Sequence, residues 1–260
     1  MKAVAYTLKY GIISYRERRI MLKKIFRSCK RELINLKNLI FRSFYISRSQ
    51  ELDTVGRFHK LYYDAHAFGK TWDSMYWMGV LTNKCPMDMW VYQEIIHEIK
   101  PDLIIECGTN RGGSALFLAS MCALIAHGEV VSIDIEEKEG RPRHERLQYL
   151  RGSSVSEEVL ERVRGFVRGK KRVMVMLDSD HRKSHVLAEL KAYNGFVTQG
   201  SYLIVEDTNI NGHPVAPDFG PGPMEAVEEF LKGSKDFIVD KSKEKFYLTF
   251  NPGGYLKKIR

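Results

Sequence analysis

Short apolar segments of this chain end in acidic side chains, at Glu106, Asp134, Asp178 and the adjacent pair Glu206 and Asp207. The carboxyl ends of parallel strands lie at one edge of a sheet, and ligands bind there. A helix cap could explain one such carboxylate, but five at one edge indicate a ligand site. Converging carboxylates are unfavourable unless protons or a cation neutralise them. The pattern therefore predicts a site that attracts positive charge.

Three of these acids form a candidate metal site. Asp178, Glu206 and Asp207 converge if the apolar segments 173–177 and 201–205 are neighbouring strands. A set of oxygen ligands suits Mg²⁺, Mn²⁺ or Ca²⁺ better than zinc. The chain has no Cys or His spacing typical of a zinc site. We therefore expect a hard divalent cation, with Mg²⁺ first.

Residues around this site could contact a substrate or move a proton. His181 follows Asp178 by three positions and is a candidate general base, although a solvated loop histidine is the alternative. Asp180 is either a competing metal ligand or a supporting partner of the site. The long segment 207–223 is either a lid or a plain surface loop. As a lid it would offer His213 and Asp218 to a substrate.

The segment 104–114 has the form of a buried strand, a glycine-rich turn and a helix start, which can receive a cofactor. A dinucleotide fingerprint would need glycine where Glu106 and Arg111 stand. A carboxylate there repels a pyrophosphate but suits the cationic, hydroxylated S-adenosylmethionine. Asp134 lies 28 positions after Glu106, within reach of ribose hydroxyls. The Gly-Ser turn that contains Ser153 and Ser154 could hold an adenine.

The elements that position these residues alternate along the chain. Strands are predicted over 103–107, 130–135, 173–177, 201–205 and 246–250, and helices over 86–96, 114–126, 156–167, 184–193 and 224–231. This alternation predicts an α/β fold with a doubly wound, mostly parallel sheet covered by helices on both faces. We expect a basic helical extension over residues 1–50, a helical lead-in over 51–100 and the cofactor-binding domain over 101–260.

Positive charge is concentrated in the extension. Residues 1–50 hold thirteen Lys and Arg against two acidic residues, a net +11 compared with +9 for the whole chain. The rest is close to neutral, which disfavours an enzyme that acts on nucleic acid. A helix is expected from about residue 17 to 44. It would pack on the body or on a second copy, or lie on an anionic membrane surface.

Membrane-spanning and redox features are not expected. No apolar run reaches the length of a transmembrane helix, and basic residues interrupt every candidate signal-peptide core. The four cysteines show neither metal-binding nor redox spacing. The simplest expectation is a cytoplasmic protein with reduced thiols, either free or held peripherally at a membrane by its extension.

From about Thr71 onward, the chain resembles the family of cephalosporin-hydroxylase-like proteins and rhamnosyl O-methyltransferases. Several separated motifs carry the resemblance: CPMDMWVYQE at 85–94, ECG at 106–108, RGGS at 111–114, RGSS at 151–154, LDSDH at 177–181, EDT at 206–208, GPGP at 220–223 and NPGGYL at 251–256. Together these motifs are specific, and they span nearly three quarters of the chain.

The resemblance implies a seven-stranded S-adenosylmethionine-dependent methyltransferase fold with a bound divalent metal, acting on a sugar or another vicinal diol in polysaccharide or lipopolysaccharide biosynthesis. It implies three sets of site residues: Glu106, Gly108, Asn110, Ser114, Asp134, Ser153 and Ser154 for the cofactor; Asp178, Glu206 and Asp207 for the metal; and His181 as the base. The alternatives are a non-catalytic binding protein, a nicotinamide-dependent oxidoreductase and a nucleic-acid methyltransferase.

Overall fold

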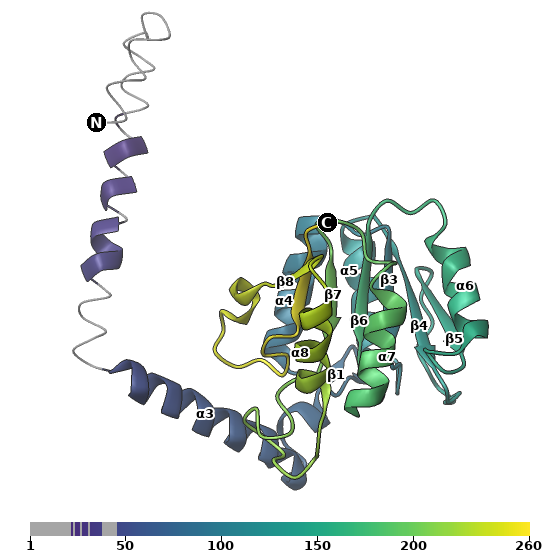
Figure 1. Ribbon diagram of the computed structural model, residues 1–260, viewed down its shortest axis with the longest axis horizontal. Coiled ribbons are helices and arrows are strands. Elements are labelled where there is room, and N and C mark those ends of the chain that lie inside the picture. Colours follow the sequence, from purple (N-terminus) through teal and green to yellow (C-terminus); the bar gives the residue numbers. More distant parts are fainter. Residues whose placement is uncertain (1–21, 23, 27, 31, 38–45) are drawn as a thin grey trace, which may run out of the picture. The chain divides into compact units, whose positions relative to one another are not determined.

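A computed structural model describes residues 22, 24–26, 28–30, 32–37 and 46–260, which belong to two compact units, Met1–Thr54 and Val55–Arg260 (Figure 1). The described residues between 22 and 37 are helical, as expected for this part of the predicted helix 17–44. The rest of that predicted helix lies outside the described residues. Among the described residues, no helix is both long and apolar enough to cross a membrane.

The larger unit alternates strands and helices as the sequence predicts. In chain order the elements are α3 (Arg48–Asp64), the 3-10 helices η1 (Ala65–Phe68) and η2 (Thr71–Ser74), β1 (Tyr76–Trp77), β2 (Val80–Leu81), α4 (Pro86–Ile99), β3 (Leu103–Cys107), α5 (Gly113–Leu124), β4 (Glu129–Asp134), β5 (Leu147–Arg151), α6 (Glu157–Val167), β6 (Val173–Leu177), α7 (Lys183–Tyr193), β7 (Tyr202–Val205), α8 (Pro223–Gly233), β8 (Phe237–Val239), η3 (Lys241–Glu244) and β9 (Tyr255–Lys258).

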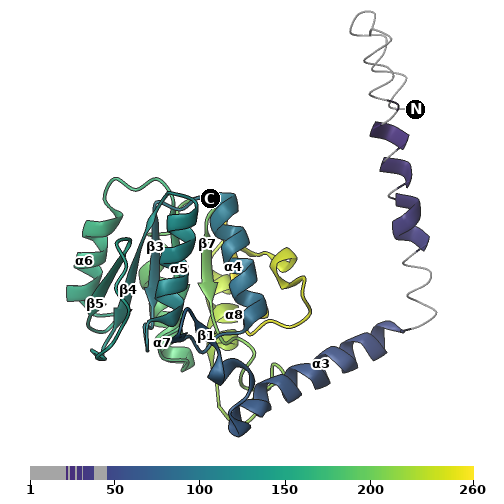
Figure 2. The same ribbon diagram turned by 180° about the vertical axis from the view of Figure 1, so that it is seen from behind.

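The central sheet has seven strands among the described residues, in the order β5-β4-β3-β6-β7-β9-β8. The five strands from β5 to β7 are parallel, and β9 runs antiparallel to both of its neighbours. Helices α4 and α5 cover one face, and α6, α7 and α8 cover the other (Figures 1 and 2). Alternate side chains of β3 serve the two faces, since Ile104 packs toward α4 and α5 while Ile105 packs toward α7. The predicted α/β fold is confirmed.

Two details of the sheet differ from the sequence prediction. The aromatic run 246–250 is not a strand, because Asp88 captures its backbone: the N–H of Phe250 donates to the buried Asp88 carboxylate at 2.7 Å. The side chains of Thr249 and Tyr255 also donate to Asp88. The antiparallel strands are instead β8 and β9. The edge strand β5 forms over residues for which the sequence analysis predicted no strand.

Candidate active site

A cavity of about 850 Å³ opens at the carboxyl ends of the parallel strands. Its lining comes from the turn after β3, the end of β4, the loops after β5, β6 and β7, and the segment that follows α3. Five predicted cofactor residues line it: Gly108, Asn110, Asp134, Ser153 and Ser154. The strand-end placement inferred from the sequence therefore brings most of these residues to one cavity.

The turn after β3 depends on glycine and on Asp134. Gly108 has a φ of +99°, and a Cβ there would lie 1.9 Å from the carbonyl oxygen of Asp178, so no side chain fits. The Asp134 carboxylate accepts hydrogen bonds from the backbone N–H of Thr109 at 3.1 Å and of Asn110 at 2.8 Å. Asp134 also pairs with Arg141 at 3.1 Å. Asp134 thus shapes the turn, and its contact with a ribose stays a prediction.

Two predicted cofactor residues, Glu106 and Ser114, are buried and do not line the cavity. Glu106 is fully buried, and burial raises its pKa despite the opposing Lys84 charge and the Ser114 and Ser132 hydroxyls. The Ser132 hydroxyl donates to Glu106 Oε2 at 2.5 Å, whereas Oε1 finds no hydrogen-bond partner among the described residues. A buried acceptor without a donor is unfavourable. Because this oxygen is buried and Glu106 does not line the cavity, the contact of Glu106 with a cofactor stays a prediction.

The loop that contains Ser153 and Ser154 and is predicted to hold an adenine is hydrogen-bonded to Glu189. The sequence analysis did not identify Glu189. Ser154 donates to Glu189 Oε1 at 2.5 Å, and Ser179 donates to the same oxygen at 2.7 Å. Glu189 is fully buried on α7, so one carboxylate ties the loop after β5 to the loop after β6. The sequence does place this glutamate among the apolar positions of α7, a pattern from which its burial could have been predicted.

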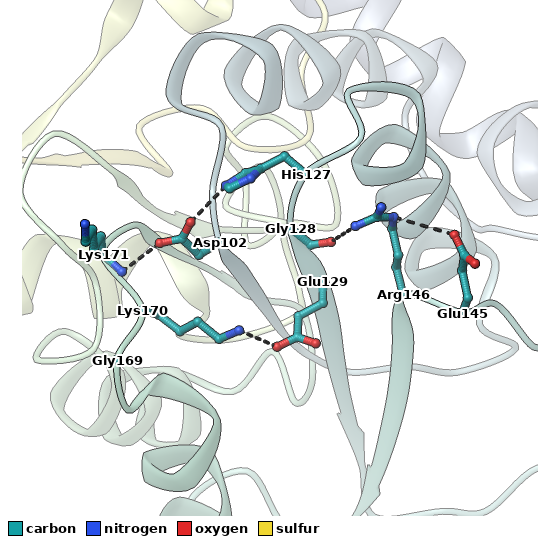
Figure 3. Close-up of a pocket in the computed structure, with 9 residues that line it drawn as sticks. All are labelled: Asp102, His127, Gly128, Glu129, Glu145, Arg146, Gly169, Lys170 and Lys171. Carbon is teal, nitrogen blue, oxygen red and sulfur yellow. Dashed lines mark hydrogen bonds and ion pairs between the residues drawn. The ribbon is translucent and has the colours of Figure 1, made fainter.

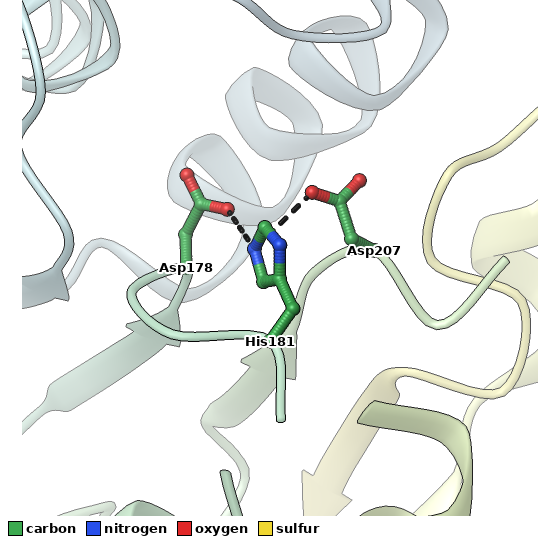
Figure 4. A group of neighbouring side chains, drawn as sticks. All are labelled: Asp178, His181 and Asp207. Atoms are coloured by element: carbon green, nitrogen blue, oxygen red, sulfur yellow. Dashed lines mark hydrogen bonds and ion pairs between the residues drawn. The ribbon is translucent and has the colours of Figure 1, made fainter. Parts of the chain in front are cut away.

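Asp178, His181 and Asp207 form a compact group at the ends of β6 and β7 (Figure 4). The imidazole lies between the two aspartates, with Nε2 3.3 Å from Asp178 Oδ1 and 3.3 Å from Asp207 Oδ2. One ligand atom from each residue lies within 4.8 Å of the others, as a shared metal ion requires. Asp207 adopts a φ of +52°, and its N–H donates to the buried Asn251 at 3.1 Å. A strained backbone of this kind is typical of functional sites.

Electrostatics in this group favour the charged forms of His181 and Asp178, whereas burial raises the pKa of Asp207 and of the neighbouring Glu206. Burial acts to lower the pKa of His181, but Asp207 and Asp178 raise it to about 9. Burial acts to raise the pKa of Asp178, but Lys84 and His181 hold it below its ordinary value. In the metal-free protein His181 is therefore an imidazolium at neutral pH, and it occupies the space between the two aspartates.

Lys84 completes the charged cluster, and the sequence analysis did not identify it. Its ammonium is 4% exposed; it donates to Asp178 Oδ2 and, at 2.6 Å, to Glu206 Oε2. Burial acts to lower the pKa of Lys84, but the two carboxylates raise it above its ordinary value. Glu206 Oε1 is buried and finds no hydrogen-bond partner among the described residues. One oxygen of Glu206 thus serves Lys84, and the other is unsatisfied.

The predicted substrate contacts on the long loop after β7 take other positions. His213 pairs with Glu225 at 2.8 Å and does not line the cavity, and Asp218 is exposed outside it. Asp180 does line the cavity, but it pairs with Arg182. From this loop the structure brings the apolar side chains Ile210 and Phe219 to the cavity. The loop therefore borders the site with apolar surface.

Aromatic side chains form part of the cavity wall. Tyr63, Trp72 and Phe250 line it, with the rings of Tyr63 and Trp72 stacked at 5.5 Å and Trp72 edge-on to Phe250 at 6.0 Å. His59 lies behind this wall, stacks on Phe250 and meets the buried Asn209 at 3.0 Å. Such rings suit the apolar faces of sugars and other partly apolar molecules.

A second hollow lies at the opposite edge of the sheet (Figure 3). Four of its charged side chains form two pairs: His127 meets Asp102 at 2.8 Å, and Lys170 meets Glu129 at 2.7 Å. It adjoins the amino ends of β3, β4 and β6, where α/β sheets do not bind their ligands. We therefore place the functional site in the cavity at the carboxyl ends.

Comparison with known proteins shows the family of this chain. The model of the family described as "Rhamnosyl O-methyltransferase/CmcI" matches residues 69–259. The chain belongs to the rhamnosyl O-methyltransferase/CmcI family. A relative from Mycobacterium leprae (strain TN), named rhamnosyl O-methyltransferase, is 40% identical over 207 residues, which cover 76% of this chain and 88% of the relative. A protein of the same name from Mycobacterium bovis (strain BCG / Pasteur 1173P2) is 39% identical and covered to 82%.

Solved structures of CmcI share the fold. A ligand-free form superposes with a TM-score of 0.58 at 19% identity, covering 76% of this chain and 84% of CmcI. A form described as containing Mg and SAM gives a TM-score of 0.57 at 19% identity, with 72% and 78% covered. The described part of the chain therefore shares its fold with CmcI, and the predicted methyltransferase fold is confirmed.

Proposed function

We propose that this protein is an S-adenosylmethionine- and divalent-metal-dependent O-methyltransferase that acts on a hydroxyl of a rhamnose-like sugar. The observation that carries the proposal is the Asp178–His181–Asp207 group, which lies between the glycine-rich turn and the aromatic wall of one cavity. Family membership and the shared name of the relatives from mycobacteria support the same activity.

The residues present fit a hard dication. Asp178 and Asp207 offer carboxylate oxygens at adjacent strand ends. The predicted ligand Glu206 is not part of the group whose ligand atoms lie within 4.8 Å of one another, but it has a buried oxygen without a hydrogen-bond partner among the described residues. Because Mg²⁺ prefers oxygen ligands, we assign these three carboxylates to the metal and leave His181 for proton transfer. When bound, the metal supplies Lewis-acid stabilisation of the acceptor oxygen as it loses its proton.

The chain's own residues orient the acceptor and move the proton. His181 lines the cavity, with Nε2 3.3 Å from an oxygen of each aspartate. With a dication held by those aspartates, His181 would lose the proton that it carries in the metal-free fold and could then accept one from an acceptor hydroxyl. The acceptor oxygen would then form a bond to the sulfonium methyl carbon while the bond between that carbon and sulfur breaks, which leaves S-adenosylhomocysteine as the thioether product. Alignment of donor and acceptor contributes roughly 7–11 kcal/mol of barrier lowering in well-oriented reactions. The apolar side chains Ile210 and Phe219 help to exclude water.

The cofactor side of the proposal can be tested by binding. We expect S-adenosylmethionine, but not NAD, to bind the purified protein in calorimetry. Asp134→Ala should weaken S-adenosylmethionine binding at least about tenfold, because it removes a ribose acceptor and loosens the backbone of Thr109 and Asn110. Asp102→Ala, which removes an acid at the opposite edge of the sheet, is the matched control. An Asp134→Ala protein with unchanged affinity refutes the role of Asp134.

The acceptor side rests on the aromatic wall. Trp72→Ala should raise the KM for a rhamnosyl acceptor about tenfold or more, since the apolar face of the sugar would lose its contact with the ring, and burial of a large apolar side chain contributes about 1.5–3 kcal/mol. The affinity for S-adenosylmethionine should stay within about threefold, because the Trp72 indole N–H donates to the Tyr63 carbonyl and not to the turn after β3. Trp90→Ala is the control, as Trp90 is 60% exposed and does not line the cavity. Equal KM changes in both variants contradict the assignment.

We also infer that the protein is cytoplasmic and attaches peripherally to anionic membranes through its basic extension. The described helical residues place apolar side chains at helical spacing, at Leu22, Ile25, Phe26, Cys29, Leu33 and Leu36. Leu22, Phe26 and Leu33 are each more than 60% exposed. A basic helix with such a face is typical of interfacial helices. Two extensions of net charge +11 would repel each other, which favours lipid over a second copy.

Vesicle sedimentation tests this attachment. The full chain should bind vesicles of phosphatidylglycerol and phosphatidylcholine, bind neutral vesicles about tenfold less, and detach as salt is raised. Phe26→Glu should lower binding severalfold, whereas Phe68→Glu, at another exposed aromatic side chain, should not. Binding that ignores lipid charge and both substitutions speaks against the extension as a lipid anchor.

A further inference from the structure

The buried ammonium of Lys84 has no role in the reaction described so far. It enters the cluster from the segment between β2 and α4, 94 residues before Asp178 and 122 before Glu206 in the chain. Its ammonium binds one oxygen of each of these carboxylates and leaves the second oxygen of each uncontacted by Lys84. The second oxygen of Asp178 meets His181, and that of Glu206 has no partner among the described residues.

The need for such a cation follows from the charges around it. Asp178, Glu206 and Asp207 lie together at the ends of two neighbouring strands, with the buried Glu106 close enough to act on Lys84 electrostatically. Buried carboxylates that lack a counter-charge either take up protons or repel one another. His181 lies between the two aspartates, but it does not reach the carboxylate pair formed by Asp178 Oδ2 and Glu206 Oε2.

We infer that Lys84 is a resident counter-cation: it holds Asp178 and Glu206 in place without the metal and weakens the affinity of the cluster for the metal. Lys84 is a positioning residue, since it touches the proposed metal ligands and does not line the cavity. Its positive charge repels a dication bound to the same carboxylates. The inference rests on the proposed function, because that function assigns the metal to this cluster.

Removal of the ammonium should therefore have two opposite effects. In Lys84→Met the metal-free protein should melt about 6–12 °C lower, because two buried carboxylates lose their counter-charge. The same protein should bind Mn²⁺ at least about tenfold more tightly and be stabilised by Mn²⁺ more than the wild type is. Lys84→Arg keeps the charge and should bind Mn²⁺ within about threefold of the wild type.

The experiment is Mn²⁺ titration followed by electron paramagnetic resonance and calorimetry, with melting curves in chelator and in Mn²⁺. Lys170→Met is the matched control, because it removes an equal charge at the opposite edge of the sheet and should leave Mn²⁺ affinity unchanged. If Lys84→Met does not fold in chelator, refolding in Mn²⁺ should recover it. Failure to recover, or unchanged or weaker Mn²⁺ binding by Lys84→Met, overturns the inference. A wild-type protein that binds no Mn²⁺ instead overturns the proposed metal dependence.

Discussion

Asp178→Asn is expected to lower metal-dependent methyl transfer about 10³-fold while S-adenosylmethionine affinity stays within about threefold. Among the described residues, Asp178 is the one carboxylate that pairs with both His181 and Lys84, so it links these two cations. An amide is a weaker metal ligand than a carboxylate, and metal Lewis-acid stabilisation is worth several kcal/mol. Each 1.4 kcal/mol corresponds to about a tenfold change in rate. Initial rates across a Mg²⁺ titration measure the effect.

Asp218→Asn is the matched control for this loss. It makes the same chemical change at an exposed position outside the cavity, so turnover should be unaffected. Melting curves should accompany both variants, because Asp178 also belongs to a buried ion pair. Wild-type turnover that persists in excess chelator, or an Asp178→Asn protein with full activity, is incompatible with the proposed role of Asp178.

His181→Gln separates a base from a metal ligand. As a base, His181 should account for about 10²–10⁴-fold of the rate, and the variant should bind Mn²⁺ more tightly than the wild type near pH 7.5, because it lacks the imidazolium that must lose a proton when the metal binds. As a ligand, its loss should weaken Mn²⁺ binding by a similar factor to Asp178→Asn. Single-turnover rates and Mn²⁺ titration on the same preparations distinguish these results. His185→Gln is the control, because His185 also lines the cavity but pairs with Glu189.

The charge on His181 adds a pH signature. Because its pKa is raised from 6.5 to about 9 in the metal-free fold, His181 stabilises that fold fully below pH 6.5, and this contribution is lost as pH rises through 9. A dication held by the same aspartates repels the imidazolium, so metal binding near pH 7.5 should release about one proton. Calorimetry in buffers of different ionisation enthalpy measures this. Equal proton release by wild type and His181→Gln rules out His181 as the source.

The sequence predicts the parts of the site that local pattern determines. Buried parallel strands are apolar runs, so the acids that follow them, such as Asp134 and Asp178, must lie at one edge of the sheet. Gly108 is similarly determined by its turn, since any side chain there meets the Asp178 carbonyl. The position of the proposed metal-site acids and of the candidate base at this edge of the sheet could therefore be predicted from the sequence.

The parts that were missed depend on contacts between distant segments. Lys84 has the local pattern of an ordinary residue before a helix, and only the packing of its segment on β6 and β7 makes it a buried cation. His213 is hydrogen-bonded to Glu225 and does not contact the cavity as predicted. The backbone N–H of Phe250 donates to Asp88, and the predicted strand does not form. These outcomes are set by tertiary hydrogen bonds that override propensity.

The most direct test of the central claim is a methyl-transfer assay on a purified rhamnosyl glycoside with S-adenosylmethionine, in Mg²⁺ and in excess chelator. Mass spectrometry should show the glycoside gaining one methylene in Mg²⁺, no gain in chelator, and recovery when Mg²⁺ is restored. A glycoside that is methylated equally well in chelator, or S-adenosylmethionine that binds without methylating any vicinal-diol acceptor, would contradict the claim.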